Sequence, residues 1–415
     1  MSKLKILHIN TYQGGGSGIA AMRLHKALRQ HGYDSRFLFL DKGKITDTEF
    51  QYAKRRNWWI FILRVLKKLH LPFTIEQRND YSIRKYKYEI EMFSFANTAY
   101  KNLHNHPLVK ESDIIHLHWV SDFLDFKSFF ENIKKPVIWT LHDMNVFLGG
   151  FHYEDDQTNY AALMSELDEK QKQIKKTALQ QVSPDKLSII TPSMWLYNLS
   201  KASQTLHKFP HYHIPNGIDT KVFKAIPREK QEAGRKLKIL FVAESLHNHR
   251  KGFDIFLPLL QEDDMINRFQ FITIGHIRNA SRLPHVTYYG IINNEERMSE
   301  LYNEADIFVL PSREDNLPNS MVESLCCGTP VVGFAIGGVR ETIADGENGY
   351  LSDSITTAGL KEALITCAEN IERLNRTNIA LQAQKLFSSE VQMKAVSEVY
   401  LQSLTTEKAE MFDTV

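Results

Sequence analysis

The segment ADIFVLPSREDNLPNSMVESLCCGTPVVGFAIGG, residues 305–338, decides the fold. Two apolar runs, 307–310 and 331–334, have the length and composition of buried strands, and apolar residues at helical spacing lie between them. Pro318 suits a first helical position, and Gly328 ends the helix. The pattern predicts a strand–helix–strand unit, and open α/β sheets bind ligands at the carboxyl ends of such strands.

Two acids lie in this unit, Asp315 in the loop and Glu323 inside the helix. Backbone N–H groups over 316–320, at the start of the helix, would bind an anion, and the carboxylates would accept hydrogen bonds from hydroxyl groups. An anion flanked by hydroxyl groups describes a nucleotide sugar, which the backbone at Gly337 and Gly338 would also approach. The alternative is an ordinary loop acid and a solvated helix residue.

The same residues resemble the E-x7-E signature of family 4 (group 1) retaining glycosyltransferases, with Asp315 standing where the first Glu is usual. The resemblance implies the GT-B fold: two Rossmann-like doubly wound parallel-sheet domains that face a central cleft. It assigns Glu323 to the ribose of the donor, and Asp315 with the backbone after it to the donor sugar. That backbone comprises Asn316, Leu317, Pro318, Asn319 and Ser320. Asp is one methylene shorter than Glu, and this departure bears on which sugar is bound.

The composition indicates a soluble protein of two domains. A chain of 415 residues exceeds the size at which a single core stops growing, and 43% hydrophobic with 24% charged residues is ordinary for a globular protein. The net charge of +2 argues against a nucleic-acid partner. The cysteines, at 326, 327 and 367, have neither zinc nor disulfide spacing and are predicted to be buried and reduced. With neither a signal-peptide pattern nor an apolar segment of about 20 residues, a cytoplasmic protein is expected.

The string IPNGID at 214–219 marks the expected domain boundary, because Pro-Asn-Gly is turn chemistry and the resembling family closes its first domain with the same string. We predict an acceptor-binding Rossmann-like domain over 1–217 and a donor-binding one over 218–389. By resemblance, 390–415 form a C-terminal helix that returns to the first domain, plus a polar tail. The charged, lysine-rich stretch 166–181 predicts a solvated helix.

A glycine-rich loop, TYQGGGSG, comes after the first predicted strand and precedes a helical pattern. Glycines allow backbone to approach an anionic or sugar group, and the resemblance places this loop near the donor phosphates and the acceptor. The glycines concerned are Gly14, Gly15, Gly16 and Gly18. An NAD-dependent oxidoreductase stays open as an alternative, because Gly16, Gly18 and Ala21 satisfy G-x-G-x-x-A, with Asp41 after the next strand. The spacing between strand and first glycine argues against it.

Two further predicted strands, 113–118 and 135–141, end in histidines. The turn at 140–143 resembles the acceptor-side histidine turn of the family, and TLHDMNVFLGGFHY at 140–153 resembles a subgroup that works on bacterial surface or capsular polysaccharides. By this resemblance His142 hydrogen-bonds the reacting sugar or shares a proton with the acceptor hydroxyl. Three other histidines are expected to be structural: His116, His118 and His152. No pair of them has a spacing that demands a metal.

A basic turn, HRKG, comes after the first strand of the second domain. Its Arg250 and Lys251 would neutralise a diphosphate and stabilise it as it departs, as in the RKG-type turn of the resembling family. The family often has another arginine soon after this strand, where this chain has Glu244 or Ser245. The phosphate contact is therefore expected to rest on Arg250 and Lys251.

Residues 53–70, AKRRNWWIFILRVLKKLH, are open to two interpretations. Trp58 and aliphatic residues can share one helical face beside clustered arginines and lysines, which suits a helix on an anionic membrane surface. The same pattern fits a helix packed on its own domain with its lysines in water. Membrane contact would suit a lipid-linked acceptor.

These observations predict a retaining glycosyltransferase of the hexosyltransferase type, which moves a sugar from a nucleoside-diphosphate sugar to a hydroxyl group of a glycan or lipid-linked acceptor. No cofactor and no metal are expected, because no D-x-D motif stands in a suitable loop. The expected role is bacterial surface polysaccharide biosynthesis, in the cytoplasm or on the inner face of the cell membrane. Besides the oxidoreductase, a non-catalytic subunit that binds a nucleotide sugar stays open.

Overall fold

The structure, a computed structural model, describes residues 3–40, 50–52, 74–84, 90–228, 234–246, 248–276 and 283–412. Within this part of the chain, contacts divide the protein into two units. Unit 1 comprises the described residues of Met1–Pro192, Leu196–Ile214 and Met393–Val415, and unit 2 those of Ser193–Trp195 and Pro215–Gln392. The stretch 53–70 and Asp41 lie outside the described residues.

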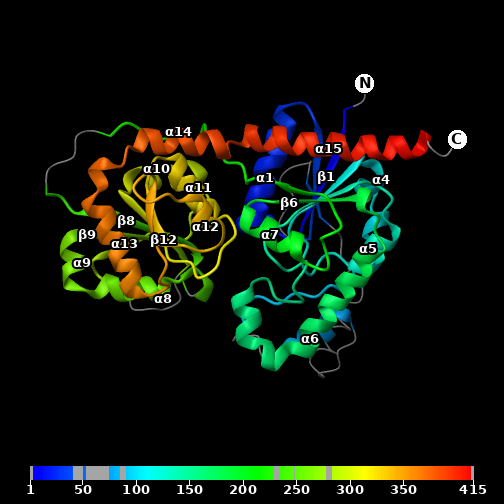
Figure 1. The fold of residues 1–415 in the computed structure, drawn as a ribbon, viewed down its shortest axis with the longest axis horizontal. Coiled ribbons are helices and arrows are strands. Elements are labelled where there is room, and N and C mark those ends of the chain that lie inside the picture. Colours follow the sequence, from blue (N-terminus) through cyan, green and yellow to red (C-terminus); the bar gives the residue numbers. More distant parts are fainter. Residues whose placement is uncertain are drawn as a thin grey trace. The chain divides into compact units, whose positions relative to one another are not determined.

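A parallel sheet forms the centre of unit 1 (Figure 1), with the order β3-β2-β1-β4-β5-β6-β7 among the described residues. The strands are β1 (Lys5–Asn10), β2 (Asp34–Phe39), β3 (Phe50–Tyr52), β4 (Ile114–Leu117), β5 (Val137–Thr140), β6 (Leu187–Thr191) and β7 (His211–His213). The order reverses between β1 and β4, which is the topological switch point of a doubly wound sheet. The register sets His8 of β1 directly beside His116 of β4.

Two helices far apart in the sequence pack on one face of this sheet. The core between them contains Leu28 of α1, Ile114 of β4, and Val396 and Tyr400 of α15. The helices along this part of the chain are α1 (Gly15–Gln30), α3 (Ile75–Ile83), α4 (Pro107–Glu111), α5 (Phe126–Asn132), α6 (Glu154–Gln180), α7 (Met194–Ala202) and α15 (Ser389–Phe412), with short 3-10 turns η2 (Leu103–Asn105) and η3 (Pro184–Lys186). The backbone of α15 continues to Phe412, where the sequence suggested a polar tail.

Unit 2 repeats the same plan, with the strand order β10-β9-β8-β11-β12-β13 and every pairing parallel. Its strands are β8 (Leu237–Ser245), β9 (Phe269–His276), β10 (Val286–Tyr288), β11 (Ile307–Leu310), β12 (Val331–Phe334) and β13 (Gly349–Ser352). The switch point lies between β8 and β11. The strands β11 and β12 have the bounds that the apolar runs predicted, because continuous apolar runs suit strands buried on both faces.

The helices of unit 2 surround this sheet (Figure 1). They are α8 (Phe253–Phe256), α9 (Asp263–Arg268), α10 (Glu295–Glu304), α11 (Asn319–Cys326), α12 (Gly337–Thr342), α13 (Thr357–Glu369) and α14 (Arg376–Phe387), with 3-10 turns η4 (His249–Lys251), η5 (Leu257–Gln261) and η6 (Ile371–Arg373). All three cysteines are buried and free, as predicted. Across the described residues, no helix combines the length and the apolar character that crossing a membrane requires.

Candidate functional site

Two loops are joined at the switch point of unit 2, one after β8 and one after β11. The backbone N–H of Arg313 donates to the carbonyl of Arg250 over 2.8 Å. Gly252 has φ +67°, and a Cβ there would lie 1.8 Å from the carbonyl oxygen of Pro311, so only glycine permits this approach. The Arg313 side chain also forms an ion pair with Asp254 at 2.6 Å, a contact that no sequence signal marked. The contacts hold the basic turn against the acidic loop.

An ion cluster forms where these loops meet. Lys251 Nζ lies 2.5 Å and Arg250 Nη1 3.3 Å from Oδ2 of Asp315, a residue only 6% exposed. Burial alone would raise the pKa of Asp315, but the two cations and a hydrogen bond from Ser312 outweigh it and lower the pKa below its ordinary value. Asp315 is therefore ionised at neutral pH. The sequence placed all three charged residues in one donor site, and the structure brings them into contact.

Helix α11 begins directly after the acidic loop. Pro318 is its N-cap residue, so it lies one position before the first helical position that the sequence suggested. Its carbonyl already accepts the N–H of Met321, which starts the helical hydrogen-bond pattern. Leu317 is buried, whereas Asn319 and Ser320 are partly exposed. The predicted donor backbone therefore presents residues 319–320 at its accessible end.

Glu323 of α11 is bonded to a neighbouring helix, and the glycine pair Gly337 and Gly338 packs against the acidic loop. Glu323 is 8% exposed, and its Oε2 accepts a hydrogen bond of 3.1 Å from the hydroxyl of Tyr302 on α10. A Cβ on Gly337 would lie 2.0 Å from the carbonyl oxygen of Asp315, and one on Gly338 would lie 1.9 Å from that of the next residue. These glycines therefore permit close packing of α12 against the acidic loop. The fold itself requires glycine at both positions, independently of any ligand.

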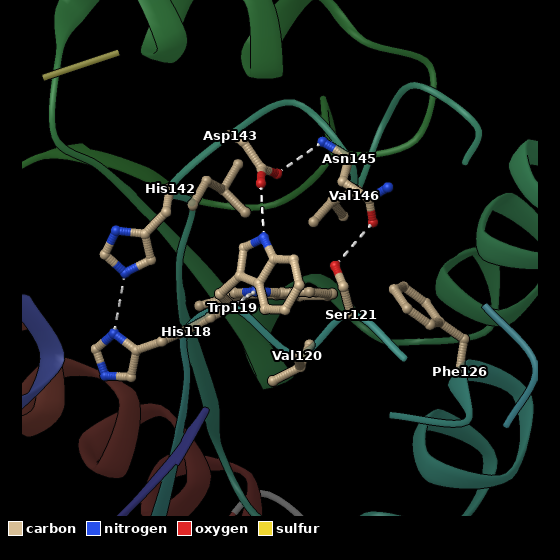
Figure 2. Close-up of a pocket in the computed structure, with 11 residues that line it drawn as sticks. His118, Trp119, Val120, Ser121, Phe126, His142, Asp143, Asn145 and Val146 are labelled. Carbon is tan, nitrogen blue, oxygen red and sulfur yellow. Dashed lines mark hydrogen bonds between the residues drawn. The ribbon is translucent and has the colours of Figure 1, made fainter. Parts of the chain in front are cut away.

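A pocket lies in unit 1, at the carboxyl ends of β4 and β5 (Figure 2). Its lining residues are His118, Trp119, Val120, Ser121, Phe126, Trp139, Leu141, His142, Asp143, Asn145 and Val146. His142 and Trp119 are partly exposed, and most of the remaining lining is buried. The pocket therefore combines buried apolar side chains with imidazole, carboxylate and amide groups, a composition typical of small-molecule sites.

The glycine loop is tied to this pocket through the ends of β1 and β4. The backbone N–H of Trp119 donates to Asn10 Oδ1 over 2.8 Å, and the Trp119 ring stacks on Tyr12 at 5.5 Å between centroids. A Cβ on Gly14 or Gly15 would meet no atom within 4 Å, whereas one on Gly18 would lie 2.5 Å from a carbonyl oxygen of the loop itself. Gly14 and Gly15 therefore border open space, and Gly18 is required for packing.

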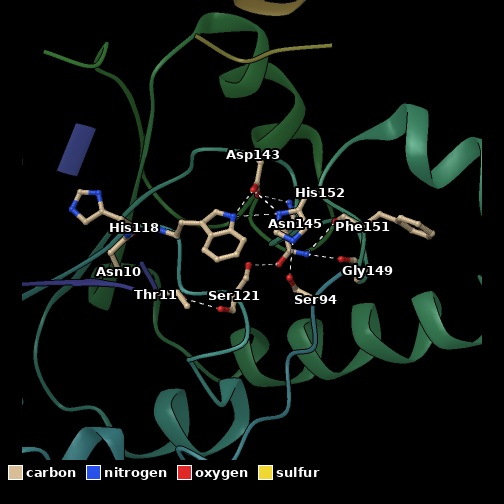
Figure 3. A network of polar contacts seen from close by, with 12 residues as sticks. Asn10, Thr11, Ser94, His118, Ser121, Asp143, Asn145, Gly149, Phe151 and His152 are labelled. Carbon is tan, nitrogen blue, oxygen red and sulfur yellow. Dashed lines mark hydrogen bonds and ion pairs between the residues drawn. The ribbon is translucent and has the colours of Figure 1, made fainter. Parts of the chain in front are cut away.

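Asp143 organises the polar side of the pocket (Figure 3). It accepts hydrogen bonds from Trp119 Nε1 at 2.8 Å, from the backbone N–H of Asn145 at 2.9 Å and from His152 Nδ1 at 2.6 Å. Burial would raise the pKa of Asp143, but His152 and these donors lower it, so the carboxylate stays ionised. Its oxygens are committed to holding the indole and the loop, so Asp143 orients groups that line the pocket.

Ser94, His152 and Asp143 are connected like a Ser–His–Asp triad. Ser94 Oγ lies 2.8 Å from His152 Nε2, whose Nδ1 is bonded to the carboxylate. Ser94 is 1% exposed and His152 is 0% exposed, so no substrate reaches the hydroxyl. In a triad the serine must contact a substrate carbonyl. We therefore assign this arrangement to fixing the loop, in agreement with the structural role expected for His152.

Helix α6 contributes a buried lysine to the same loop. Lys175 Nζ donates to the carbonyl of Gly149 at 2.5 Å and to both the carbonyl and the side-chain oxygen of Asn145. Burial lowers the pKa of Lys175 to about 7. Asp168 of the same helix accepts the N–H of Gly150 over 2.7 Å. The prediction of a solvated helix over 166–181 is wrong for this face, which is buried against the pocket loop.

Four histidines line up from the core of unit 1 to the pocket. His116 bonds to the hydroxyls of Tyr400 at 2.6 Å and Thr140 at 2.8 Å, a structural role as predicted. His118 was also expected to be structural, yet it lines the pocket and lies 3.3 Å from His142, nitrogen to nitrogen. Nitrogens of His8, His116 and His118 lie within 4.8 Å of one another. Hydrogen bonds already occupy both nitrogens of His116 and His118, so these imidazoles fit a metal ion poorly.

Comparison with known proteins finds similarity to glycosyltransferases. Residues 236–370, which contain the ion cluster and Glu323, match the family model "Glycosyl transferases group 1". The N-acetyl-alpha-D-glucosaminyl L-malate synthase of Bacillus anthracis is 23% identical over 432 residues, covering 98% of this chain and 99% of that protein. Other relatives match over a part only, and the chain spans less than half the length of the first curated relatives it matches. One is an uncharacterised glycosyltransferase of Methanocaldococcus jannaschii, 28% identical over 162 residues, which cover 36% of this chain and 44% of that protein.

Two solved structures share the fold over nearly the whole chain. Sucrose-phosphate synthase from Thermosynechococcus elongatus has a TM-score of 0.67 at 16% identity, covering 97% of this chain and 100% of that one. The HepE protein of Anabaena, solved in complex with UDP-glucose, has a TM-score of 0.63 at 14% identity and covers 96% and 99%. These likenesses confirm the predicted fold class, GT-B with two Rossmann-like units.

Proposed function

We propose that the protein is a retaining glycosyltransferase that moves a sugar from a nucleoside-diphosphate sugar to a hydroxyl group of a glycan or lipid-linked acceptor. The observation that carries the proposal is the contact of Lys251 and Arg250 with Asp315 at the switch point of unit 2. This cluster lies inside the segment that matches the glycosyltransferase family model. HepE, which shares the fold, was solved with UDP-glucose.

Unit 2 is proposed to bind the donor. Lys251 and Arg250 contact the diphosphate, because charge-assisted hydrogen bonds from cations are the strongest contacts available to phosphate oxygens. Asp315 and the backbone at 319–320 contact the sugar, and Glu323 accepts hydrogen bonds from the ribose hydroxyls. Asp315 shares its carboxylate between the cations and the sugar. It thus links binding of the two parts of the donor.

Unit 1 is proposed to bind the acceptor in the pocket beside the glycine loop. Aromatic rings such as the stacked Tyr12 and Trp119 suit the apolar face of a sugar ring, and polar side chains in the pocket suit its hydroxyls. The resemblance of 140–153 to a polysaccharide subgroup favours a role in bacterial surface polysaccharide biosynthesis.

The reaction exchanges one bond at the anomeric carbon. The bond to the diphosphate oxygen breaks, and the acceptor oxygen bonds on the same face, which keeps the configuration. The acceptor proton passes to the departing diphosphate. Lys251 and Arg250 stabilise the negative charge that develops on that group, a contribution that grows towards the transition state.

Titration calorimetry with UDP-, GDP- and ADP-sugars and with NAD(H) tests the proposal. We expect one nucleotide sugar to bind, and Glu323→Gln to weaken it about tenfold or more, the value of a hydrogen bond to a charged group. Glu362→Gln, an exposed position on α13, is the matched control and should bind normally. Binding of NAD(H) alone, unaffected by Glu323→Gln, would contradict the proposal and favour the oxidoreductase.

A non-catalytic nucleotide-sugar subunit is the second candidate, favoured by Asp315 in place of the usual Glu. Incubation with the bound nucleotide sugar and a panel of surface-polysaccharide acceptors distinguishes the two. The enzyme releases nucleoside diphosphate in step with acceptor glycosylation. The subunit binds the donor with the same affinity and releases none.

A further inference from the structure

Three imidazoles form a hydrogen-bonded row in unit 1, which we call the histidine chain: His8 in β1, His118 after β4 and His142 after β5. His8 Nδ1 lies 2.9 Å from His118 Nε2, and His118 Nδ1 lies 3.3 Å from His142 Nε2. Figure 2 shows the second ring nitrogen of His142 on the side of the ring away from His118. The chain therefore connects the interior of the sheet with a residue that lines the pocket.

All three rings are neutral at neutral pH. Burial lowers the pKa of His8 and His118 well below the ordinary value, and it lowers the pKa of His142 to about 4. A neutral imidazole carries a single N–H, so one ring nitrogen donates and the other accepts. The protons of the histidine chain can then be arranged in only two ways, with every N–H directed towards His142 or every N–H directed away from it.

The inner end of the chain decides between these arrangements. His8 Nε2 is buried and has no hydrogen-bond partner among the described residues. The His8 ring is stacked between Phe37 at 5.0 Å and His116 at 5.1 Å. With the protons directed away from His142, Nε2 would carry an N–H with no acceptor, whereas the opposite arrangement leaves only a lone pair there. A buried unpaired donor is the rarer of the two in proteins, so the protons are directed towards His142.

We propose that His8 and His118 are positioning residues that hold His142 in its Nδ1–H form, so that His142 acts as a neutral hydrogen-bond donor to a substrate oxygen. The proposal rests on the proposed function for its substrate, a sugar hydroxyl or a phosphate oxygen. The sequence left open whether His142 hydrogen-bonds the sugar or takes the proton of the acceptor hydroxyl. With a proton on Nδ1 and with Nε2 accepting from His118, the His142 ring has no lone pair available to take that proton.

Nuclear magnetic resonance of protein with 15N-labelled histidine tests the protonation directly, without substrate. At neutral pH we expect His142, His118 and His8 each to show a protonated Nδ1 and an unprotonated Nε2. The His142 signals are identified by their loss in His142→Asn. His118→Phe keeps a stacked ring but removes the donor to His142 Nε2, so the partly exposed His142 ring should no longer be held in the Nδ1–H form. A protonated Nε2 on His142 in the unaltered protein would overturn the proposal, whatever the variants do.

Two substitutions of His142 test through the reaction rate which of its nitrogens donates to the substrate. The amide nitrogen of Asn takes the place of Nδ1, and that of Gln takes the place of Nε2. We expect His142→Asn to keep turnover within about tenfold of the unaltered protein, and His142→Gln to lose about a hundredfold, the usual value of one well-placed donor. Equal losses, or a better result for Gln, would contradict the assignment. If no sugar is transferred by the unaltered protein, the proposed function fails while the resonance measurement still decides the histidine chain.

Discussion

The two switch points have the same backbone plan and opposite electrostatics. In unit 2, two cations surround the ionised Asp315. In unit 1, neutral imidazoles and stacked aromatic rings line the pocket, and its one ionised carboxylate, Asp143, is bonded to groups of the protein. Buried charges are tolerated only where partners compensate their desolvation. The difference teaches that one fold can offer permanent charge to a diphosphate and neutral donors to hydroxyl groups, depending on the loop residues at the end of each strand.

Removal of the central carboxylate should have the largest effect on unit 2. Asp315→Asn leaves Lys251 and Arg250 facing each other with no anion. We therefore expect the free energy of unfolding to fall by about 3–5 kcal/mol, the usual cost of breaking a buried ion pair. Because the folded-state pKa of Asp315 lies below its unfolded value, this stabilisation is present above the unfolded pKa and is lost as pH falls through the folded one. Denaturant unfolding at pH 7 and at acid pH measures the destabilisation by Asp315→Asn and its dependence on pH.

Asp254→Asn is the matched control, because this carboxylate pairs with Arg313 at an exposed position where ion pairs contribute at most about 1 kcal/mol. A loss as large as that of Asp315→Asn would mean that burial does not distinguish the two pairs. A negligible effect of Asp315→Asn would show that the clustered cations need no anion.

Lys251→Ala should weaken donor binding by about a hundredfold, because it removes a charge-assisted contact to phosphate. Lys251→Arg should restore part of the affinity. Titration with the nucleotide sugar gives the dissociation constants, and Lys385→Ala, an exposed lysine on α14, is the control. If both alanine variants bind equally well, the charged character of the unit 2 switch point serves stability alone.

The neutral character of unit 1 predicts its own pH dependence. Burial lowers the pKa of His116 to about 3, so the unfolded chain binds more protons than the folded one between that value and the ordinary pKa of about 6.5. Stability therefore falls as pH is lowered through this window, by about 1.4 kcal/mol per pH unit for one histidine. In His116→Gln that slope should be smaller by the same amount.

Hydrogen exchange of unit 1 peptides, followed from pH 7 to pH 4, measures this slope separately from unit 2. His207→Gln, at an exposed position, is the control. An unchanged slope in His116→Gln would mean that His116 does not carry the pH dependence.

The apolar interior strands were readable from the sequence, whereas the edge strands β7 and β13 were not. The runs 307–310 and 331–334 are continuous, apolar and bounded by turn residues, so the pattern gave their ends directly. The sequence did not indicate β7 or β13, because His211–His213 and much of Gly349–Ser352 are only partly buried and have no period-two or continuous apolar pattern.

Some residues of the candidate site could also be found from the sequence, whereas others could not. Asp315, Glu323 and Lys251 were singled out by their positions after predicted strands, and a resemblance assigned them to one site. Their contact could not be derived from the sequence, since 64 residues separate Lys251 from Asp315 and only the β8–β11 pairing brings them together. The residues that hold the unit 1 loop had no signal. Lys175 lies in a helix whose overall composition indicates solvent, and its burial depends on how that helix packs. Local pattern predicts elements, while contacts across the sheet depend on strand order.

Tyr12→Ala should have the smallest effect and tests the aromatic part of the comparison. Tyr12 is 48% exposed and stacks on Trp119, so its loss should leave the fold intact while removing one face of the proposed acceptor site. We expect the acceptor KM to rise by up to about tenfold, since aromatic contacts contribute about 0.5–1.5 kcal/mol, with donor affinity unchanged. Tyr81→Ala, which removes another exposed tyrosine of unit 1, is the control. A loss of donor affinity in Tyr12→Ala would contradict the assignment of the donor to unit 2 and the acceptor to unit 1, because it would place the donor against the neutral switch point of unit 1.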